Sequence, residues 1–351
     1  MSRTKSIRTL ALAGFVSAGK LSHAYRSLLP VLALCVTSAA WSQAIPRARG
    51  ARVPPNMSGG AQPAKPAAVT PANSQYRFVT IEIPGAGATC GTSYFCDYAG
   101  GVNDAGLVTG QYLNTSSTYS GFAWQNGILH TLDYPGATDT HLEGVNNRGV
   151  AIGDYNPNET STEYVVTYSF QSGAWTMLPS IPNTVYNEGY GVNDFGVAVG
   201  QAFGATGNVA WIWYPSSQSY SFFAVPGSTQ YSTTPGLLND KGQVVGQYQD
   251  SSGVWHGFLK EGESYTTIDP PDSTYTYAVG INNSGTIVGL WQNLSGWFEG
   301  FVRTSDGVFT AVNVPGGLET QIDAINDRGD ICGDFVDPNT GQWTPFVAFK
   351  Q

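Results

Sequence analysis

Charged residues, histidines and cysteines are all scarce in this sequence. Charged side chains make up 12% of the 351 residues, and there are only 4 His and 4 Cys. An average soluble domain carries about 25% charged residues. Hydrophobic residues nevertheless reach 41% and aromatic residues 13%. This composition excludes a wholly disordered chain, because disorder requires low hydrophobicity together with high charge.

The periodic Ala, Glu, Lys, Arg and Leu pattern of a helical bundle or coiled coil is also missing. The chain instead contains 43 Gly, and Asn-Asp or Asn-Asn pairs separate short runs rich in Val, Thr, Tyr and Trp. Runs of this kind between turn-forming residues are typical of short strands joined by tight turns. The sequence therefore predicts an all-β fold.

Acidic residues are confined to one part of the chain. Residues 1–44 carry five basic residues and no acid, whereas residues 76–351 carry seven basic residues and all 25 acids, which is 7 − 25 = −18. A folded part with this charge repels nucleic-acid phosphates and anionic membrane surfaces. We therefore expect no nucleic-acid partner.

The N-terminus is typical of a secretory signal. A basic leader precedes an apolar run over residues 28–36, and Ser42-Gln43-Ala44 fits a cleavage site of small residues. The run is too short to span a bilayer, which takes about 20 residues, and no later segment could span one. We predict a signal peptide over residues 1–44, a disordered Pro- and Ala-rich linker over 45–75, and a secreted protein, extracellular or periplasmic, that is a monomer.

The cysteines fit export into an oxidising compartment. Cys35 would leave with the signal peptide, and Cys90 and Cys96 lie six residues apart in one predicted loop. We predict a disulfide between Cys90 and Cys96. Cys332 stands where the other repeats carry Val or Ile, so we expect a buried apolar thiol there.

One motif occurs six times. An Asn is followed by Asp or Asn, then by Gly at the third and seventh positions after it, with successive Asn 43, 47, 46, 43 and 44 residues apart. The six copies begin at Asn103, Asn146, Asn193, Asn239, Asn282 and Asn326. Such a regular repeat is the signature of an array of similar structural units.

Each repeat contains four segments that are predicted to form strands. One strand ends at the Asn, one runs through the later Gly, one is aromatic, as in Gly121-Phe122-Ala123-Trp124, and one ends in Pro, as in Val312-Asn313-Val314-Pro315. Four short strands in about 44 residues match one blade of a β-propeller.

The points at which the repeat pattern starts and stops along the chain predict a closed ring. The last repeat stops before its Pro-terminated strand, and residues 78–85 supply such a strand ahead of the first repeat. Pairing of these segments would leave no open sheet edge. We therefore predict that residues 76–351 form a six-bladed β-propeller with four-stranded blades, closed by an N-terminal strand that completes the last blade.

The Asn motif is explained by turn chemistry. An Asn or Asp side chain caps a tight turn, the first Gly takes the positive φ that follows, and the later Gly keeps the strand slim where neighbouring blades approach. The alternative, a calcium loop, requires alternating oxygens and a bidentate Glu, and the motif has neither. We predict no metal and no cofactor.

The repeats, together with His256-Gly257-Phe258-Leu259, resemble the HAF-family extracellular repeat of bacteria over about residues 76–351. Most copies depart from the His-Ala-Phe core of that family, because Gly, Val or Pro replaces Ala and His is present once. The resemblance implies a secreted bacterial repeat protein of undetermined activity and carries over no catalytic residue.

No hydrolase, metalloprotease, phosphate-loop or dinucleotide motif occurs, and the three His beyond the leader lie on different predicted strands. The position five residues before each Asn instead varies between repeats on a constant scaffold. It holds Tyr98, His141, Glu188, Thr234, Tyr277 and Gln321. These residues would stand at one mouth of the central channel, either as a ligand-binding ring or as ordinary solvated side chains.

Two functions remain open from the sequence, besides a purely structural surface protein. The first is a non-catalytic binding module for a glycan or an extracellular protein, with Trp255, Trp297 and Trp343 either stacking on sugars or covering the blades. The second is a carbohydrate-active enzyme, a glycoside hydrolase or lyase, with Glu188 and either Glu143 or Asp323 as acid and base.

Overall fold

The computed structural model describes residues 75–84, 86, 97–157, 162–204 and 207–351. These residues form β-strands and turns, with no α-helix among them, so the all-β prediction is confirmed. The predicted signal peptide, the predicted linker up to residue 74 and the Cys90–Cys96 pair lie outside the described residues.

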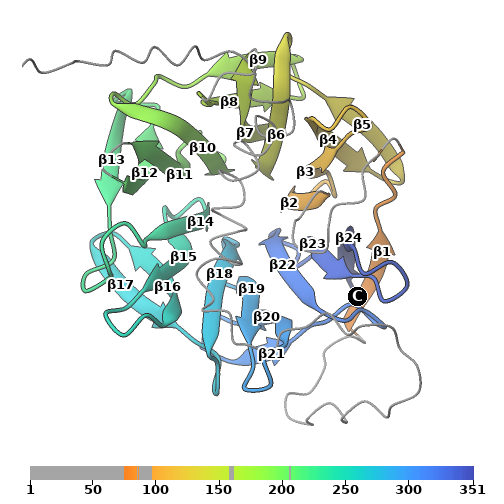
Figure 1. The fold of residues 1–351 in the computed structure, drawn as a ribbon, viewed down its shortest axis with the longest axis vertical. Coiled ribbons are helices and arrows are strands. Elements are labelled where there is room, and N and C mark those ends of the chain that lie inside the picture. Colours follow the sequence, from red (N-terminus) through yellow and green to blue (C-terminus); the bar gives the residue numbers. More distant parts are fainter. Residues whose placement is uncertain (1–74, 85, 87–96, 158–161, 205–206) are drawn as a thin grey trace, which may run out of the picture.

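Each repeat places its four strands in the same order from the centre of the molecule outward (Figure 1). The strands nearest the centre, called inner strands here, are β2 (Tyr98–Val102), β6 (Ala137–Val145), β10 (Thr184–Val192), β14 (Thr234–Leu238), β18 (Tyr275–Ile281) and β22 (Thr320–Ile325). The second strands are β3 (Val108–Leu113), β7 (Val150–Pro157), β11 (Ala198–Gly204), β15 (Val244–Gln249), β19 (Ile287–Gln292) and β23 (Ile331–Val336).

The third strands are β4 (Tyr119–Gln125), β8 (Tyr164–Ser169), β12 (Gly207–Tyr214), β16 (Trp255–Glu261), β20 (Phe298–Arg303) and β24 (Trp343–Lys350). The outer strands are β5 (Ile128–Leu132), β9 (Ala174–Met177), β13 (Ser219–Phe223), β17 (Ser264–Ile268), β21 (Phe309–Ala311) and β1 (Tyr76–Thr80). Strands within each repeat pair antiparallel, in four four-stranded sheets and one eight-stranded sheet. The larger sheet joins two groups of four through a single residue pair, Trp255 with Tyr275.

The first strand of the chain pairs with the last. Strand β1 lies antiparallel to β24, with Phe78 opposite Ala348 and Thr80 opposite Phe346. The backbone N–H of Ile81 extends the ladder by donating to the carbonyl of Pro345 at 2.9 Å. The N-terminal strand therefore occupies the outer position of the last repeat, which has no outer strand of its own.

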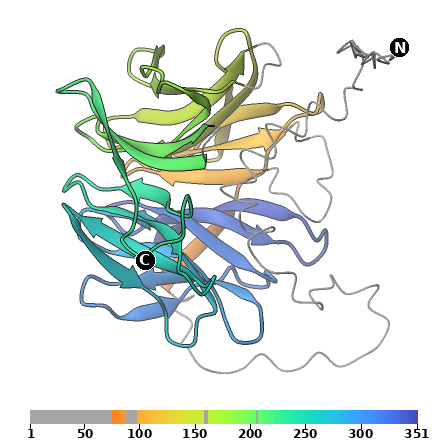
Figure 2. The ribbon, with the colours of Figure 1, turned by 60° about the vertical axis from the view of Figure 1, so that its left-hand side comes forward.

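The inner and outer strands differ in burial because they lie at different depths. All seven residues of β18 are buried, whereas the residues of β13 are exposed or partly buried, as are those of β17 apart from the buried Ile268. One face of an outer strand meets solvent, which is ordinary for a half-buried antiparallel strand. Figure 2 shows the sheets from the side, where neighbouring sheets lie against one another.

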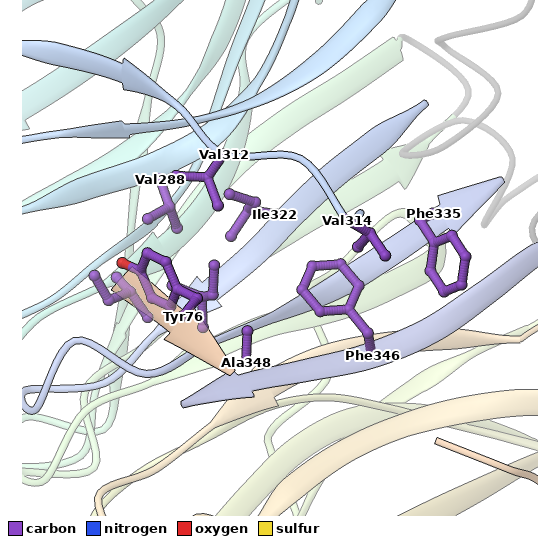
Figure 3. Packing of buried hydrophobic residues seen from close by; sticks show 10 residues of the cluster. Tyr76, Val288, Val312, Val314, Ile322, Phe335, Phe346 and Ala348 are labelled. Carbon is purple, nitrogen blue, oxygen red and sulfur yellow. The ribbon is translucent and has the colours of Figure 1, made fainter. Parts of the chain in front are cut away.

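The core is built by aromatic residues of the third strands. Phe122, Phe258, Phe301 and Phe346 are at most 1% exposed. Figure 3 shows how one core cluster joins the chain ends: Tyr76 of β1 and Phe346 of β24 pack with Ile322 of β22 and Val288 of β19. Removing a buried Phe of this kind costs about 3–5 kcal/mol, so the terminal strands are held by packing as well as by hydrogen bonds.

The Asn motif forms the turn that the sequence predicts. The side-chain oxygen of Asn103 accepts hydrogen bonds from the backbone N–H groups of Ala105 and Leu107 at 3.0 and 3.1 Å. Gly106, the first Gly of the motif, has φ of 71°. A side chain would strain the backbone in this region. The turn interpretation is thereby confirmed.

The prediction for the later Gly needs correction. A Cβ on Gly110 would lie 1.9 Å from the Tyr98 carbonyl oxygen, which belongs to the adjoining strand of the same sheet, and 2.7 Å from the Phe122 ring. The approach to the neighbouring sheet is made instead by the Gly two residues before the Asn, because a Cβ on Gly101 would lie 2.7 Å from the Val145 nitrogen. The later Gly therefore leaves room for the adjoining strand and the core aromatic ring of its own sheet.

The six Asn side chains also link one inner strand to the next. Asn103 donates from Nδ2 to the carbonyl of Asn146 at 3.0 Å. The same bond runs from Asn146 to Asn193, Asn193 to Asn239, Asn239 to Asn282, Asn282 to Asn326 and Asn326 back to Asn103. Each motif Asn thus forms its own turn with its oxygen and holds the next repeat with its nitrogen.

Candidate functional site

The residues five positions before each Asn lie on the inner strands, and most of them are buried. Exposed fractions are 0% for His141, 1% for Glu188, 6% for Tyr277 and 3% for Gln321. Thr234 is also buried, and Tyr98 is partly buried. The candidate acids Glu143 and Asp323 are 7% and 0% exposed. These side chains therefore form a polar interior.

A second set of interior residues faces this ring from the second strands. Each is the residue directly after the later Gly of the motif, and each lies opposite a ring residue in the sheet. The pairs are Tyr98 with Gln111, His141 with Asp154, Glu188 with Gln201, Thr234 with Gln247, Tyr277 with Leu290 and Gln321 with Asp334. This set was not predicted from the sequence, although its constant position eight residues after each Asn could have revealed it.

The second repeat brings a histidine and two acids together. His141 Nδ1 lies 2.7 Å from Asp154 Oδ1. Glu163, just before β8, joins them, so that one nitrogen or oxygen of each of the three side chains lies within 4.8 Å of the others. All three residues are buried. We call His141, Asp154 and Glu163 the interior triad.

Burial and charge act in opposite directions on the triad histidine. Burial alone would lower the pKa of His141, but the neighbouring Asp154 carboxylate outweighs it and raises the pKa to about 9. Burial also raises the pKa of Glu163 to about 8, assisted by the charge of Asp154. The triad consequently favours bound positive charge, whether carried by protons or by another cation.

Glu188 lies in the neighbouring inner strand under similar conditions. The Tyr190 hydroxyl donates to Glu188 Oε2 and also lies 3.3 Å from Gln201 Oε1. Burial and the charge of Glu163 raise the pKa of Glu188 well above its ordinary value. Glu188 is therefore a buried, hydrogen-bonded acid.

Glu143 interacts electrostatically both with the triad residues Asp154 and His141 and with Asp323, a further buried acid. Gln321 donates from Nε2 to Asp323 Oδ1, and burial raises the pKa of Asp323 to about 7. Burial raises the pKa of Asp334 well above its ordinary value, and the charge of Asp323 adds to this. Burial likewise raises the pKa of Glu143, with Asp154 and Asp323 contributing.

A shallow axial pocket lies at the opposite ends of the inner strands. The motif Asn residues and their successors from five repeats line it. Each successor side chain accepts a hydrogen bond from the backbone N–H of the preceding repeat, as when Asp194 Oδ1 accepts from Asn147 N at 2.8 Å. The series closes when Asp104 accepts from Asp327 at 2.9 Å. The carboxylates of this rim are thus part of the turn network.

The three tryptophans named from the sequence differ in position and exposure. Trp255 and Trp343 begin the third strands β16 and β24 and are partly buried, and Trp255 packs beside the Tyr275 ring. Trp297 is one position earlier in its repeat, in the turn between β19 and β20, and is 48% exposed. Only Trp297 of the three presents much of its ring to solvent.

The remaining candidates occupy separate places. Cys332 is fully buried, as predicted, and its thiol lies 3.4 Å from the carbonyl oxygen of Ala99. His256 lies between two exposed or partly exposed acids, with Nδ1 2.6 Å from Asp269 and Nε2 3.3 Å from Asp250. Among the described residues there is no helix of the length and hydropathy needed to cross a membrane.

Comparisons with known proteins give similarities at low identity. No family model matches the sequence, and no curated protein matches it. Among solved structures, AofleA from Arthrobotrys oligospora is 12% identical with a TM-score of 0.48, over 78% of this chain and 86% of that one. The SapL1 lectin in complex with alpha methyl fucoside is 10% identical with a TM-score of 0.48, over 73% and 93%. TolB from Acinetobacter baumannii is 8% identical with a TM-score of 0.48, over 70% of this chain. The match covers 64% of the TolB chain, which is less than two thirds of its length.

Proposed function

We propose that the protein is a secreted, closed six-bladed β-propeller that binds a glycan without converting it. Two structural features support the ring. Strand β1 supplies the outer strand of the last sheet, and the side chains of the six motif Asn hydrogen-bond in a series that returns to its start. A ring of this kind holds its connecting loops at fixed positions, which a recognition surface requires.

The observation that carries the binding function is the presentation of Trp297. Asn293 Oδ1 accepts hydrogen bonds from the backbone N–H groups of Ser295 and Trp297, at 2.9 and 3.2 Å. Asn293 is itself held by Glu299 at 3.0 Å. A turn fixed in this way exposes a large indole ring at low cost in conformational entropy, which is the property of an aromatic binding anchor.

Other exposed apolar residues lie at the same strand ends as Trp297. Val254 and Leu294 are 40% and 75% exposed in the connections between second and third strands. Tyr231 and Leu318 are 43% and 44% exposed in connections that lead into inner strands. Antiparallel topology brings both kinds of connection to one face of the ring, so these residues belong to the face that carries Trp297.

Among the exposed apolar residues of this face, Tyr231 has a strained backbone. Tyr231 has φ of 63°, a conformation that is uncommon for a bulky residue. Its ring covers Gly207, where a Cβ would lie 2.4 Å from the ring. Strain of this kind gathers at binding sites, which supports a recognition role for this face.

The chemistry around Trp297 suits a sugar. A flat indole face can stack on the apolar face of a pyranose, while side chains beside it hydrogen-bond the hydroxyls. Gln292, Thr274 and Glu299 supply an amide, a hydroxyl and a carboxylate next to this turn. The candidate catalytic acids Glu143, Glu188 and Asp323 are at most 7% exposed, which favours binding over turnover of a polymer.

A glycan array with the purified protein tests this function. Binding to a defined set of glycans should fall at least tenfold in Trp297→Ala, since the lost stacking removes a principal contact. Phe195→Ala is the matched control, because Phe195 is 65% exposed in the turn at the opposite strand ends. Equal binding by the native protein and both variants, or release of reducing sugar from a bound glycan, would refute the proposal.

A further inference from the structure

The second repeat carries a histidine and two acids at three interior positions that meet in space. The third-strand residue three positions before the core aromatic is Tyr119, Trp255, Phe298 or Trp343 in four repeats and Asn208 in the third. In the second repeat Val166 takes the place of the core aromatic, because it pairs with Gly153, the later Gly of the motif. The residue three positions before Val166 is Glu163. A buried carboxylate replaces an aromatic ring there, and it does so beside His141 and Asp154.

The scaffold does not require these three residues. The positions of His141 and Asp154 hold Tyr98 and Gln111 in the first repeat and Thr234 and Gln247 in the fourth. Both repeats form the same four-stranded arrangement. A histidine and two acids at all three positions therefore serve something other than the fold.

The triad is incompletely satisfied by the chain. Glu163 is 0% exposed, and neither of its carboxylate oxygens has a hydrogen-bond partner among the described residues. Nε2 of His141, also 0% exposed, likewise has none there. A buried carboxylate without hydrogen-bond partners is unfavourable unless a proton or another cation compensates its charge. Both residues belong to the cluster in which one nitrogen or oxygen of each side chain lies within 4.8 Å of the others.

The surroundings add negative charge. Asp139, Glu143 and Glu188 are 7%, 7% and 1% exposed, and they interact electrostatically with triad residues. His141 is the only basic side chain in this group, so its acids must either hold protons or be balanced by a bound cation. A bound cation would supply the missing charge.

We propose that His141, Asp154 and Glu163 form a binding site for a divalent transition-metal ion, with Zn²⁺ as the fitting example. Imidazole nitrogen and carboxylate oxygen are both donors that zinc takes from proteins. Calcium and magnesium prefer oxygen ligands alone, and calcium takes six to eight of them. The imidazole therefore selects a transition metal over both. This site lies in the interior and is separate from the glycan-binding face proposed above.

Metal binding can be measured on the purified protein by calorimetry and thermal unfolding. The native protein, stripped with a chelator, should bind one equivalent of ZnCl₂ and unfold at a higher temperature in its presence. CaCl₂ at the same concentration should give no such shift. In Glu163→Gln the affinity for zinc should fall more than about tenfold, as expected when a metal site loses a supporting group.

The unfolding temperature without zinc distinguishes the loss of the metal site from a folding defect. Glu163→Gln replaces a buried acid that has no hydrogen-bond partner among the described residues, so the zinc-free variant should unfold at or above the temperature of the zinc-free native protein, while its zinc-induced rise is lost. His256→Gln is the control, because His256 with Asp250 and Asp269 offers another histidine and two acids nearer the surface. The proposal fails if Glu163→Gln keeps the zinc-induced rise, if His256→Gln loses it, or if the native protein binds no zinc.

Discussion

Asn326 donates a hydrogen bond from Nδ2 to the carbonyl oxygen of Asn103 at 2.9 Å, although the two residues are 223 positions apart in the chain. The other five bonds of this series join repeats that are neighbours in sequence. The Asn326 bond joins the last repeat to the first. A single side chain thus stabilises a contact between the two ends of the repeat array.

Asn326→Ala should destabilise the protein by about 3 kcal/mol. The variant loses the bond to Asn103 and the turn bonds that Asn326 Oδ1 accepts from Arg328 and Asp330 at 3.0 and 2.9 Å. Buried groups left without partners cost about 1–3 kcal/mol each. Urea unfolding measures the change. Asn339→Ala, at an exposed position between β23 and β24, should stay within about 0.5 kcal/mol of the native protein.

Deletion of residues 76–84 should cause aggregation. Strand β24 would lose its partner β1 along five residue pairs, and an unpaired strand edge recruits other chains. The core would also lose Tyr76 and Ile81, which are 8% and 1% exposed. Size-exclusion chromatography and thermal unfolding test this. A protein lacking residues 45–74 is the control and should stay monomeric, and a monomeric 76–84 deletion with an unchanged unfolding temperature would contradict the pairing.

Gly246→Ala should destabilise the protein by about 3 kcal/mol or prevent folding, because overpacking a core without room forces the backbone to move. The new Cβ would lie 2.3 Å from the Thr234 carbonyl oxygen and 2.5 Å from the Phe258 ring. Gly262→Ala separates this clash from the general effect of losing a glycine. Gly262 has φ of 57° and no atom within 4 Å of the added Cβ, so its variant should lose only about 1–2 kcal/mol. Equal losses in chemical denaturation would remove the steric explanation.

The all-β fold and its four-stranded antiparallel sheets could be predicted from the sequence because the residues that build them recur at fixed spacing. Asn103 and Gly110 have counterparts in all six repeats, since each turn and each close strand approach imposes the same physical demand. The prediction that the later Gly faces a neighbouring blade was wrong. The spacing shows that a small residue is needed at this position, but it does not show which backbone that residue contacts. That backbone is the Tyr98 carbonyl of the same sheet.

The interior site could not be found in this way. His141, Asp154 and Glu163 lie on three strands or their ends and follow no motif, so that only the sheet register brings them together. Glu163 also stands at a position where most repeats carry an aromatic residue, and sequence periodicity alone did not align that position. The proposed metal ligands stand at positions where the residue differs from repeat to repeat. A search for repeats finds only the positions where the residue stays the same.

The free energy of unfolding should decrease as pH rises from about 4 to 7, because Asp323 and Asp334 hold protons more tightly in the folded protein. Burial raises the pKa of Asp323 from 3.8 to about 7, and burial with the Asp323 charge raises that of Asp334 well above 3.8. The folded state binds more protons than the unfolded state in this window, so stability is present at low pH and is lost as pH rises. The slope is about 1.4 kcal/mol per pH unit for each proton involved.

Asp334→Asn isolates this pair from the other acids. The variant removes one titrating group and the negative charge beside Asp323, so its unfolding free energy should depend less on pH between 4 and 7. Asp306→Asn is the control, because Asp306 is an exposed acid whose pKa is lowered by its hydrogen bond to Thr304, and this variant should keep the native slope. Urea unfolding at pH 4, 5, 6 and 7 gives the three profiles. If Asp334→Asn follows the native curve, the two carboxyls do not share a proton-dependent interaction in the folded protein.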